Sequence, residues 1–316
     1  MRESRNYTNP TVTIVVPVLN EARNLELILP ELPLVHEVVL VDGNSKDDTV
    51  ATARRLMPDI KVVTQTRKGK GNALVCGFAA ATGDIIVMFD ADYSADPAEI
   101  PAFVQALKAG ADFAKGTRNA PGGGSEDITV VRGLGNKGLN VLSNVMIKGR
   151  YSDLCYGYNA FWRDILPALE LPSPQLVPAP GTDRIWGDGF EIETLLTCRV
   201  AAADLLVTEV PSVERLRVHG ASNLNAVSDG LRVLRTIVTE RYGRGARPEA
   251  MVPAPLAAND TRPVPALTLV GGIDLIAEKP SRYPHGRGGI VHVLRPGSGS
   301  KRTARGHQVG IDRASS

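Results

Sequence analysis

The chain has 316 residues, of which 43% are hydrophobic and 22% are charged, an ordinary composition for a soluble globular protein with one large domain or two smaller ones. Its formal net charge is +2, but residues 1–242 hold 25 Lys and Arg against 29 Asp and Glu, and residues 243–316 hold 11 against 5. The excess of basic over acidic residues therefore lies in the tail, residues 243–316. The body is slightly acidic and has no basic patch interleaved with aromatic residues, which argues against nucleic acid as its partner.

Residues 11–115 alternate between strand and helix patterns. The β-branched run Thr11–Leu19 predicts a first strand, and a helix opens at Asn20. Further strands are predicted over 38–41, 60–63, 84–89 and 112–115, and the helices between them run to about Met57, over 69–82 and over 97–108, with Ser45 and Asp47 as caps of the second helix. Strict alternation with short loops predicts an α/β fold with a mostly parallel sheet.

The pattern changes after the fifth strand. Ala120–Asp127 is a glycine-rich loop. Two interpretations are equally compatible with its sequence, a lid over a binding site and a loop that is simply exposed to solvent. Helices are predicted over 131–148, 190–200 and 227–242, and strands over 157–161 and 205–210. The helix Val227–Tyr242 has apolar residues on one side and arginines elsewhere, which favours a core-packed helix with a basic outer face over a helix on an anionic membrane.

The domain organisation follows from composition. We expect an N-terminal extension over 1–10, one domain over 11–242 and a basic Pro/Gly-rich tail over 243–316 that is largely disordered, or else a basic arm for acidic lipid or a partner. The three cysteines are widely separated, which excludes a cysteine zinc cluster and indicates a reducing compartment. No apolar leader and no apolar stretch near 18 residues is found, so we expect a cytoplasmic protein without a signal peptide or membrane span.

One buried strand runs directly into two acids. The apolar segment Ile85–Phe89 is followed by Asp90 and Asp92, and two carboxylates at the end of such a strand are costly unless a positive charge lies between them. Mg²⁺ or Mn²⁺ is the simplest candidate, because both prefer oxygen ligands and often hold substrate phosphates as well. The alternative is an acidic turn that caps the helix beginning near Pro97.

Two more polar clusters follow predicted strands. They are Asn20-Glu21 and Asp42–Ser45, and ligands of parallel sheets bind at the carboxyl ends of the strands. The first strand is not followed by G-x-G-x-x-G, and Lys68–Asn72 lacks the P-loop spacing, which excludes the common dinucleotide and nucleoside-triphosphate loops. There is no G-x-S-x-G elbow and no H-E-x-x-H motif.

Taken together and in order, these clusters resemble the motifs of family 2 glycosyltransferases of the GT-A fold, most closely the dolichyl- and polyprenyl-phosphate mannosyl- and glucosyltransferases. The resemblance covers about residues 11–242 and rests on Val15–Glu21, Val41–Thr49, Gly69–Ala73, Asp90–Asp92, Gly116–Arg118, Asp153–Arg163, Val210-Pro211 and Arg217–Asn223. Gly43, Asn44 and Asp48 depart from the family pattern, and Ser94 stands where the family often has Gln.

The resemblance implies a Rossmann-like, mostly parallel mixed sheet flanked by helices, and a GDP- or UDP-sugar as donor. It implies that Asp42 accepts a hydrogen bond from the base, and that Asp90 and Asp92 hold the metal, with Ser94 or water as third ligand. The other residues that it places at the donor or at the acceptor phosphate are Pro17, Val18, Asn20, Glu21, Lys70, Ala91, Arg118, Arg132 and Arg217.

The expected reaction is one in-line displacement with inversion. An acceptor phosphate is already an anion and needs no base, whereas a hydroxyl acceptor needs a carboxylate, for which Asp153, Asp188 and Glu191 are candidates. Asp188 and Glu191 are also consistent with a capping box at a helix start. We expect transfer of mannose or glucose to a polyprenyl phosphate, with peripheral membrane contact. The alternatives are a soluble hydroxyl acceptor and a non-catalytic module that binds nucleotide sugars.

Overall fold

The computed structural model describes residues 5–126, 130–147, 149–220 and 226–243, together with three short strands beyond them. Its framework is one sheet with the strand order β11-β8-β5-β7-β4-β1-β2-β3. The strands of this sheet are β1 (Val12–Val18), β2 (Glu37–Asp42), β3 (Lys61–Thr64), β4 (Ile85–Met88), β5 (Phe113–Thr117), β7 (Asn159–Trp162), β8 (Val207–Pro211) and β11 (Val291–Val293). Two small pairs lie apart from it, β6 (Gly124–Ser125) with β9 (Val213–Glu214) and β10 (Ile273–Asp274) with β12 (Arg295–Pro296).

Strand direction confirms the predicted mostly parallel, mixed sheet. In the described sheet, β7 runs antiparallel to both neighbours, β4 and β5, and the other pairs are parallel. The register places Val18 opposite Asp42 and Val15 opposite Met88. The residues that follow β1, β2 and β4 therefore meet at one edge of the sheet.

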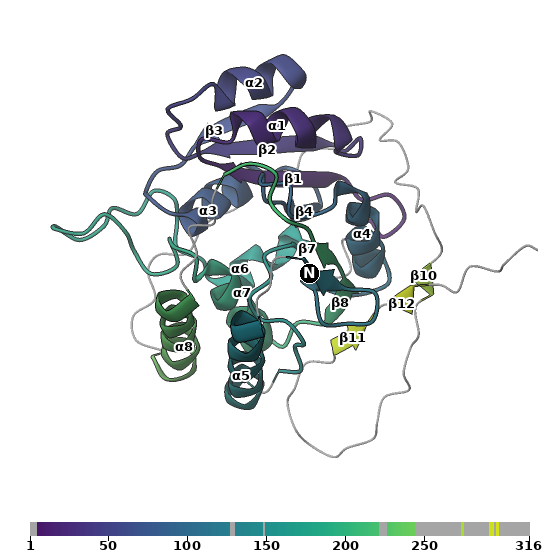
Figure 1. The fold of residues 1–316 in the computed structure, drawn as a ribbon, viewed down its shortest axis with the longest axis vertical. Helices are drawn as coiled ribbons and strands as arrows, with labels where there is room; N and C mark the ends of the chain where they lie inside the picture. The colour runs from purple at the N-terminus through teal and green to yellow at the C-terminus, as the bar shows by residue number, and fades with distance from the viewer. Residues whose placement is uncertain are drawn as a thin grey trace, which may run out of the picture.

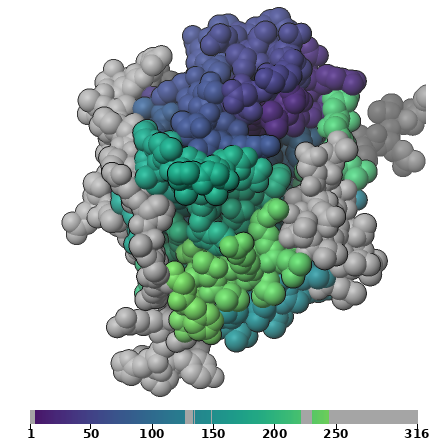
Figure 2. Space-filling view, turned by 90° about the vertical axis from the view of Figure 1, so that its left-hand side faces the viewer, coloured from purple at the N-terminus to yellow at the C-terminus, as the bar shows by residue number. Residues whose placement is uncertain are grey.

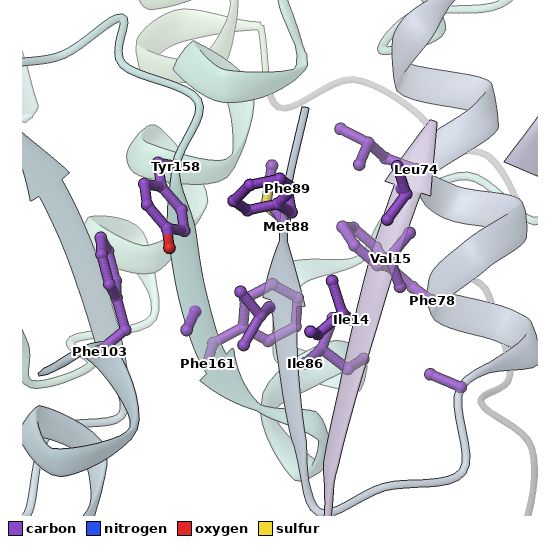
Figure 3. Packing of buried hydrophobic residues seen from close by; sticks show 14 of the residues in the cluster. Ile14, Val15, Leu74, Phe78, Ile86, Met88, Phe89, Phe103, Tyr158 and Phe161 are labelled. Carbon is purple, nitrogen blue, oxygen red and sulfur yellow. The ribbon is translucent and has the colours of Figure 1, made fainter. Parts of the chain in front are cut away.

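Helices cover both faces of the sheet. Figures 1 and 3 show α3 on one side of β1 and β4, and α4 on the other. The helices are α1 (Ala22–Ile28), α2 (Thr49–Leu56), α3 (Lys70–Ala80), α4 (Ile100–Lys108), α5 (Val130–Ile147), α6 (Leu166–Leu169), α7 (Ile192–Ala202) and α8 (Ala226–Tyr242). Short 3-10 turns occupy Leu29–Glu31, Pro97–Glu99 and Arg163–Ile165.

The core is built from the apolar faces of β1, β4 and β7 and the two helices beside them (Figure 3). On one side the ring of Phe78 from α3 meets Phe161 edge-on, with ring centroids 5.3 Å apart. On the other side Phe103 from α4 stacks on Tyr158 at 4.3 Å. Burial of these large aromatic side chains stabilises the packing of both helices on the sheet near the site.

The start of helix α2 differs in part from the prediction. Helix α2 begins at Thr49, whose backbone N–H donates to the Asp47 carboxylate at 3.1 Å, so Asp47 lies at the helix start as predicted. Ser45 binds the segment before α1 instead. The Ser45 hydroxyl accepts from the backbone N–H of Asn20 at 2.9 Å, and Asp47 accepts from that of Ala22 at 3.2 Å. These contacts join the loops after β1 and β2, so the two predicted caps tie neighbouring strand ends together.

The tail lies mostly outside the described residues. Of positions 244–316, the structure describes only strands β10, β11 and β12, so the predicted disorder of the rest stays a prediction. Val291–Val293, in the tail, adds to the sheet as β11, parallel to β8.

Two long helices form the end of the molecule opposite α1 and α2. Helix α8 packs against α5 and α7, and the space-filling view shows α8 exposed on the surface next to α5 (Figure 2). Within the described ranges, no helix combines the length and the apolar content needed to cross a bilayer.

Candidate functional site

The site lies where β1, β2 and β4 end. The backbone N–H of Gly43 donates to the carbonyl oxygen of Val18 at 2.8 Å, and that of Phe89 donates to Val15 at 3.0 Å, so the three chain segments leave the sheet side by side. Asp42, Asp90 and Asp92 follow directly. The sheet thus brings together the three polar clusters that the sequence places after separate strands.

Asp92 is the most enclosed acid of the D-x-D pair. Only 6% of it is exposed, and its Oδ1 accepts hydrogen bonds from the backbone N–H and the hydroxyl of Ser94, at 3.0 and 2.6 Å. Its Oδ2 forms an ion pair with Arg217 at 3.0 Å. Ser94 therefore lies at the pair, as predicted for a third ligand, but it acts here as a donor to Asp92.

Arg217 reaches Asp92 from the segment between β9 and α8. This segment, green in Figure 1, passes from the end of β4 toward α1. It is held at one end by the Arg215 N–H, which donates to the Ser94 carbonyl at 2.8 Å, and at the other by the Asn24 amide, which donates to the His219 carbonyl at 3.3 Å. An arginine late in the chain is thereby fixed beside the earlier acidic motif.

Asp90 belongs to a separate ion cluster. Lys70, the first residue of α3, lies 2.7 Å from Asp90 Oδ2 and 2.7 Å from Oε1 of Glu193 on α7. Burial lowers the pKa of the Lys70 ammonium, but the charges of Asp90 and Glu193 raise it by more, so the pKa is raised overall and Lys70 stays charged.

The side of the site near α1 and β2 carries the residues assigned to the ribose and base. Burial raises the pKa of Glu21, against a hydrogen bond from Asn24. Both carboxylate oxygens of Asp42 lie within hydrogen-bonding distance of the Ser45 N–H, at 3.1 and 3.3 Å. Asn20 adopts a left-handed backbone conformation with φ of 59°, and its side-chain oxygen accepts from the Lys46 N–H. Pro17 and Val18, at the end of β1, pair with the last residues of β2.

Arg118 and Asp153 are paired with each other. Arg118 binds both carboxylate oxygens of Asp153, at 2.7 and 2.9 Å, and its third nitrogen lies 2.9 Å from Glu214. Burial raises the pKa of Asp153, but Arg118 lowers it by more, so the pKa ends below its ordinary value. A carboxylate held in this way is a weak base, and the guanidinium already has two anionic partners.

Asp188 and Glu191 organise the loop before α7. Asp188 is fully buried and accepts from Arg67 Nε and Nη2 at 2.8 and 2.9 Å, while Glu191 accepts from the backbone N–H groups of Gly187 and Gly189. Because α7 begins only at Ile192 and Asp188 binds Arg67, the capping-box interpretation is wrong.

Two residues of this region were missed by the sequence reasoning, Arg67 and Glu193. Glu193 sits on α7 among the buried residues Ile192, Leu195 and Leu196, and a carboxylate at such a position needs a cation. A charged residue within this apolar stretch of the sequence therefore indicates a buried ion pair. Arg132 was predicted at the site, but its side chain lies outside the described part of α5.

Comparison with known proteins bears on this arrangement. The sequence model of a family described as "Glycosyl transferase family 2" matches residues 13–169. This chain belongs to that family. The dolichol-phosphate mannosyltransferase of Pyrococcus furiosus is 31% identical over 223 residues, which are 67% of this chain and 59% of that protein. An uncharacterised glycosyltransferase of Mycobacterium tuberculosis is 39% identical over 112 residues, which are 35% of this chain and 50% of that protein.

Solved structures agree on the fold. The glucosyl-3-phosphoglycerate synthase of Mycobacterium tuberculosis, in complex with Mn²⁺, UDP and glucosyl-3-phosphoglycerate, superposes with a TM-score of 0.55 at 23% identity, covering 74% of this chain and 80% of that one. Its complex with Mg²⁺ and UDP gives 0.56 at 23%, with the same coverage. Our chain therefore has the GT-A fold of the family. It spans only 50–59% of the length of the curated relatives named above.

The residues of the family's D-x-D motif fit a divalent cation. Asp90, Asp92, Glu21 and Glu193 contribute four formal negative charges, against two positive charges from Lys70 and Arg217. Carboxylate and hydroxyl oxygens are the ligands that Mg²⁺ and Mn²⁺ prefer. In the described part of the chain, no three acidic, histidine or cysteine side chains converge into a complete metal site.

Proposed function

We propose that this chain is a metal-dependent, inverting glycosyltransferase that moves mannose or glucose from a GDP- or UDP-sugar to a polyprenyl or dolichyl phosphate. The observation that carries the proposal is the D-x-D pair at the end of β4, with Lys70 and Arg217 beside it. Support comes from family membership and from the likeness to a protein named dolichol-phosphate mannosyltransferase.

The charges of the site suit departure of a nucleoside diphosphate. As the bond to the sugar breaks, negative charge develops on the diphosphate, and fixed cations stabilise it. Asp90 and Asp92 would hold Mg²⁺ or Mn²⁺, which supplies positive charge to the diphosphate oxygens when bound. Lys70 and Arg217 lie next to these carboxylates and add two more positive charges.

The state of the candidate bases favours an acceptor that is already an anion. Asp153 is bound by Arg118, Asp188 is bound by Arg67, and Glu191 accepts backbone N–H groups of its own loop. A hydroxyl acceptor would need one of these carboxylates as a base, whereas a phosphate acceptor needs none. This contrast favours the lipid phosphate over a soluble hydroxyl acceptor.

The outer surface of α5 and α8 supports peripheral membrane contact. Both helices expose large apolar side chains, and α8 also exposes two arginines: Val141, Val145, Leu231, Val238, Tyr242, Arg235 and Arg241. The expected basic outer face of α8 is thus partly apolar, while Ile237 on its inner side is fully buried. A surface that combines apolar and basic groups suits the boundary of an anionic bilayer.

An assay of sugar transfer tests the proposal. Radiolabelled GDP-mannose, GDP-glucose and UDP-glucose are each incubated with the protein and Mn²⁺, with polyprenyl phosphate or 3-phosphoglycerate as acceptor. We expect transfer to polyprenyl phosphate, and we expect Asp92→Asn to reduce kcat at least about 100-fold, because the metal loses a charged ligand. Asp59→Asn changes an exposed acid before β3 that is not among the proposed site residues. This variant is the control and should retain activity.

Three results would count against the proposal. If no donor is consumed with Mn²⁺ present, the transferase assignment fails. Transfer to 3-phosphoglycerate alone would replace the lipid acceptor with a soluble one. Full activity of Asp92→Asn would remove the metal assignment.

A further inference from the structure

We infer that Glu193 is a positioning residue that sets the metal affinity of the site, by holding Lys70 when a divalent cation takes Asp90. The inference rests on the proposed function, and it starts from one geometric fact. Asp90 Oδ2, an oxygen of a proposed metal ligand, is bound by the Lys70 ammonium at 2.7 Å. A metal ion that binds this carboxylate must therefore share its negative charge with a protein cation.

The two anions that share Lys70 differ in exposure. The side chain of Asp90 is 33% exposed, whereas that of Glu193 is 8% exposed, and both carboxylates lie 2.7 Å from the same ammonium nitrogen. A cation that enters from solvent with the donor thus meets Asp90 first. Glu193, on the inner side, stays available to Lys70.

Lys70 lies in a closely packed cluster. Gly157 lies against the cluster, and a Cβ atom at this position would come within 3.2 Å of Glu193 Oε1, 3.3 Å of Lys70 Nζ and 3.4 Å of Asp90 Oδ2. The backbone of Lys70 is fixed as the first residue of α3. If a metal took over the charge of Asp90, Glu193 would remain at 2.7 Å as the counter-charge of Lys70.

Binding of Lys70 and of the metal to Asp90 are thermodynamically linked. Two cations that compete for one carboxylate weaken each other's binding, and the coupling is reciprocal. With Glu193 present, Lys70 can release Asp90 without becoming an unpaired buried charge, which would be costly. Without Glu193, Lys70 depends on Asp90 alone, so the metal must displace it against a larger penalty.

A double-mutant comparison of Mn²⁺ binding tests the inference. Free Mn²⁺ is followed by electron paramagnetic resonance, with Mn²⁺ alone and with UDP or GDP added. We expect Glu193→Gln to raise the Kd for Mn²⁺ at least about fivefold. The double variant Lys70→Met/Glu193→Gln removes the competing cation as well, so its Kd should return to the wild-type value or below.

The control is Glu240→Gln. Glu240 is a comparably enclosed glutamate, with a 9% exposed side chain that pairs with Arg199, and its replacement should leave the Kd unchanged. Circular dichroism and thermal unfolding of each variant establish that it is folded. A merely structural role for Glu193 would make the double variant at least as weak as the single one.

The outcomes separate this inference from the proposed function. An unchanged Kd in Glu193→Gln, a double variant as weak as Glu193→Gln, or an equal loss in Glu240→Gln overturns the role of Glu193. In each of these cases a wild-type protein that binds Mn²⁺ leaves the transferase proposal standing. If the wild type binds no Mn²⁺ with or without nucleotide, both fail together.

Discussion

Arg67 illustrates how one buried side chain can hold a long loop. Its guanidinium binds both carboxylate oxygens of Asp188, and Nη1 lies 3.0 Å from the carbonyl oxygens of Ser173, Pro174 and Leu176. Arginine can do this because its planar head offers five N–H donors in a fixed fork. The two ends of the segment before α7 are thereby joined beside the start of α3.

Breaking this pair should be strongly destabilising. Asp188→Asn leaves the Arg67 charge buried without its anion, and we expect a loss of about 3–5 kcal/mol in the free energy of unfolding. Guanidinium chloride denaturation measures the loss. The control is Glu26→Gln, which breaks an ion pair with Arg55 in which both side chains are more than half exposed, and which should cost less than about 1 kcal/mol. Equal losses in the two variants would contradict the argument.

At the scale of elements, the start of α3 is fixed by close approach to the loop before α7. Gly69 has φ of 130°, and a Cβ atom on Gly69 or Gly71 would overlap the carbonyl oxygen of Asp188 or Gly187. The Asn72 N–H donates to the Asp188 carbonyl at 3.2 Å. The glycines of the G-K-G sequence are thus explained by packing of backbone on backbone, which also places Lys70.

A pair of glycine substitutions tests this explanation. Gly71→Ala should destabilise the protein by roughly 3 kcal/mol, because the rigid carbonyl of Gly187 cannot move aside. Gly138→Ala, in the exposed interior of α5 with open space around it, should instead stabilise by up to about 1 kcal/mol, since alanine favours the helix. Thermal unfolding of both variants measures the two signs, and a gain in Gly71→Ala would refute the packing argument.

At the scale of the whole molecule, one carboxyl group links stability to pH. Glu99, at the turn before α4, accepts from the Ser212 hydroxyl and from the Val213 N–H, and so joins α4 to the end of β8 and the start of β9. Burial raises the pKa of Glu99 by more than the hydrogen bonds from Ser212 and Val213 lower it, so that the pKa lies at about 7 rather than at its ordinary value of 4.5.

The sign of the effect follows from the raised pKa. Between about pH 4.5 and 7 the folded protein keeps the Glu99 proton while the unfolded chain releases it, so the free energy of unfolding falls as the pH rises through this range. Glu99→Gln removes this contribution. We expect the stability of the variant relative to the wild type to increase by on the order of 2 kcal/mol from pH 5 to pH 8, measured by denaturation at both values. A difference that does not change with pH would contradict the assignment.

The sequence by itself determined the succession of strands and helices along the chain and the polar residues that follow the strands. Apolar runs such as Ile85–Phe89 and the acids that follow them are local features, and in a parallel sheet the strand direction alone places Asp42, Asp90 and Asp92 at one edge. The antiparallel insertion of β7 was not predictable, because nothing in a short apolar run specifies its direction.

Only the tertiary structure decided which charged side chains form ion pairs. Arg67 pairs with Asp188, 121 positions away in the chain. Lys70 at the start of α3 binds both Asp90, which follows β4, and Glu193 on α7. The sequence supplies these charges but not the distances between them, and an ion pair forms only where packing of distant segments brings two side chains within about 4 Å. For this reason the sequence could name Asp153, Asp188 and Arg118 as site residues, while the fold determined that each of them is held by a partner of opposite charge.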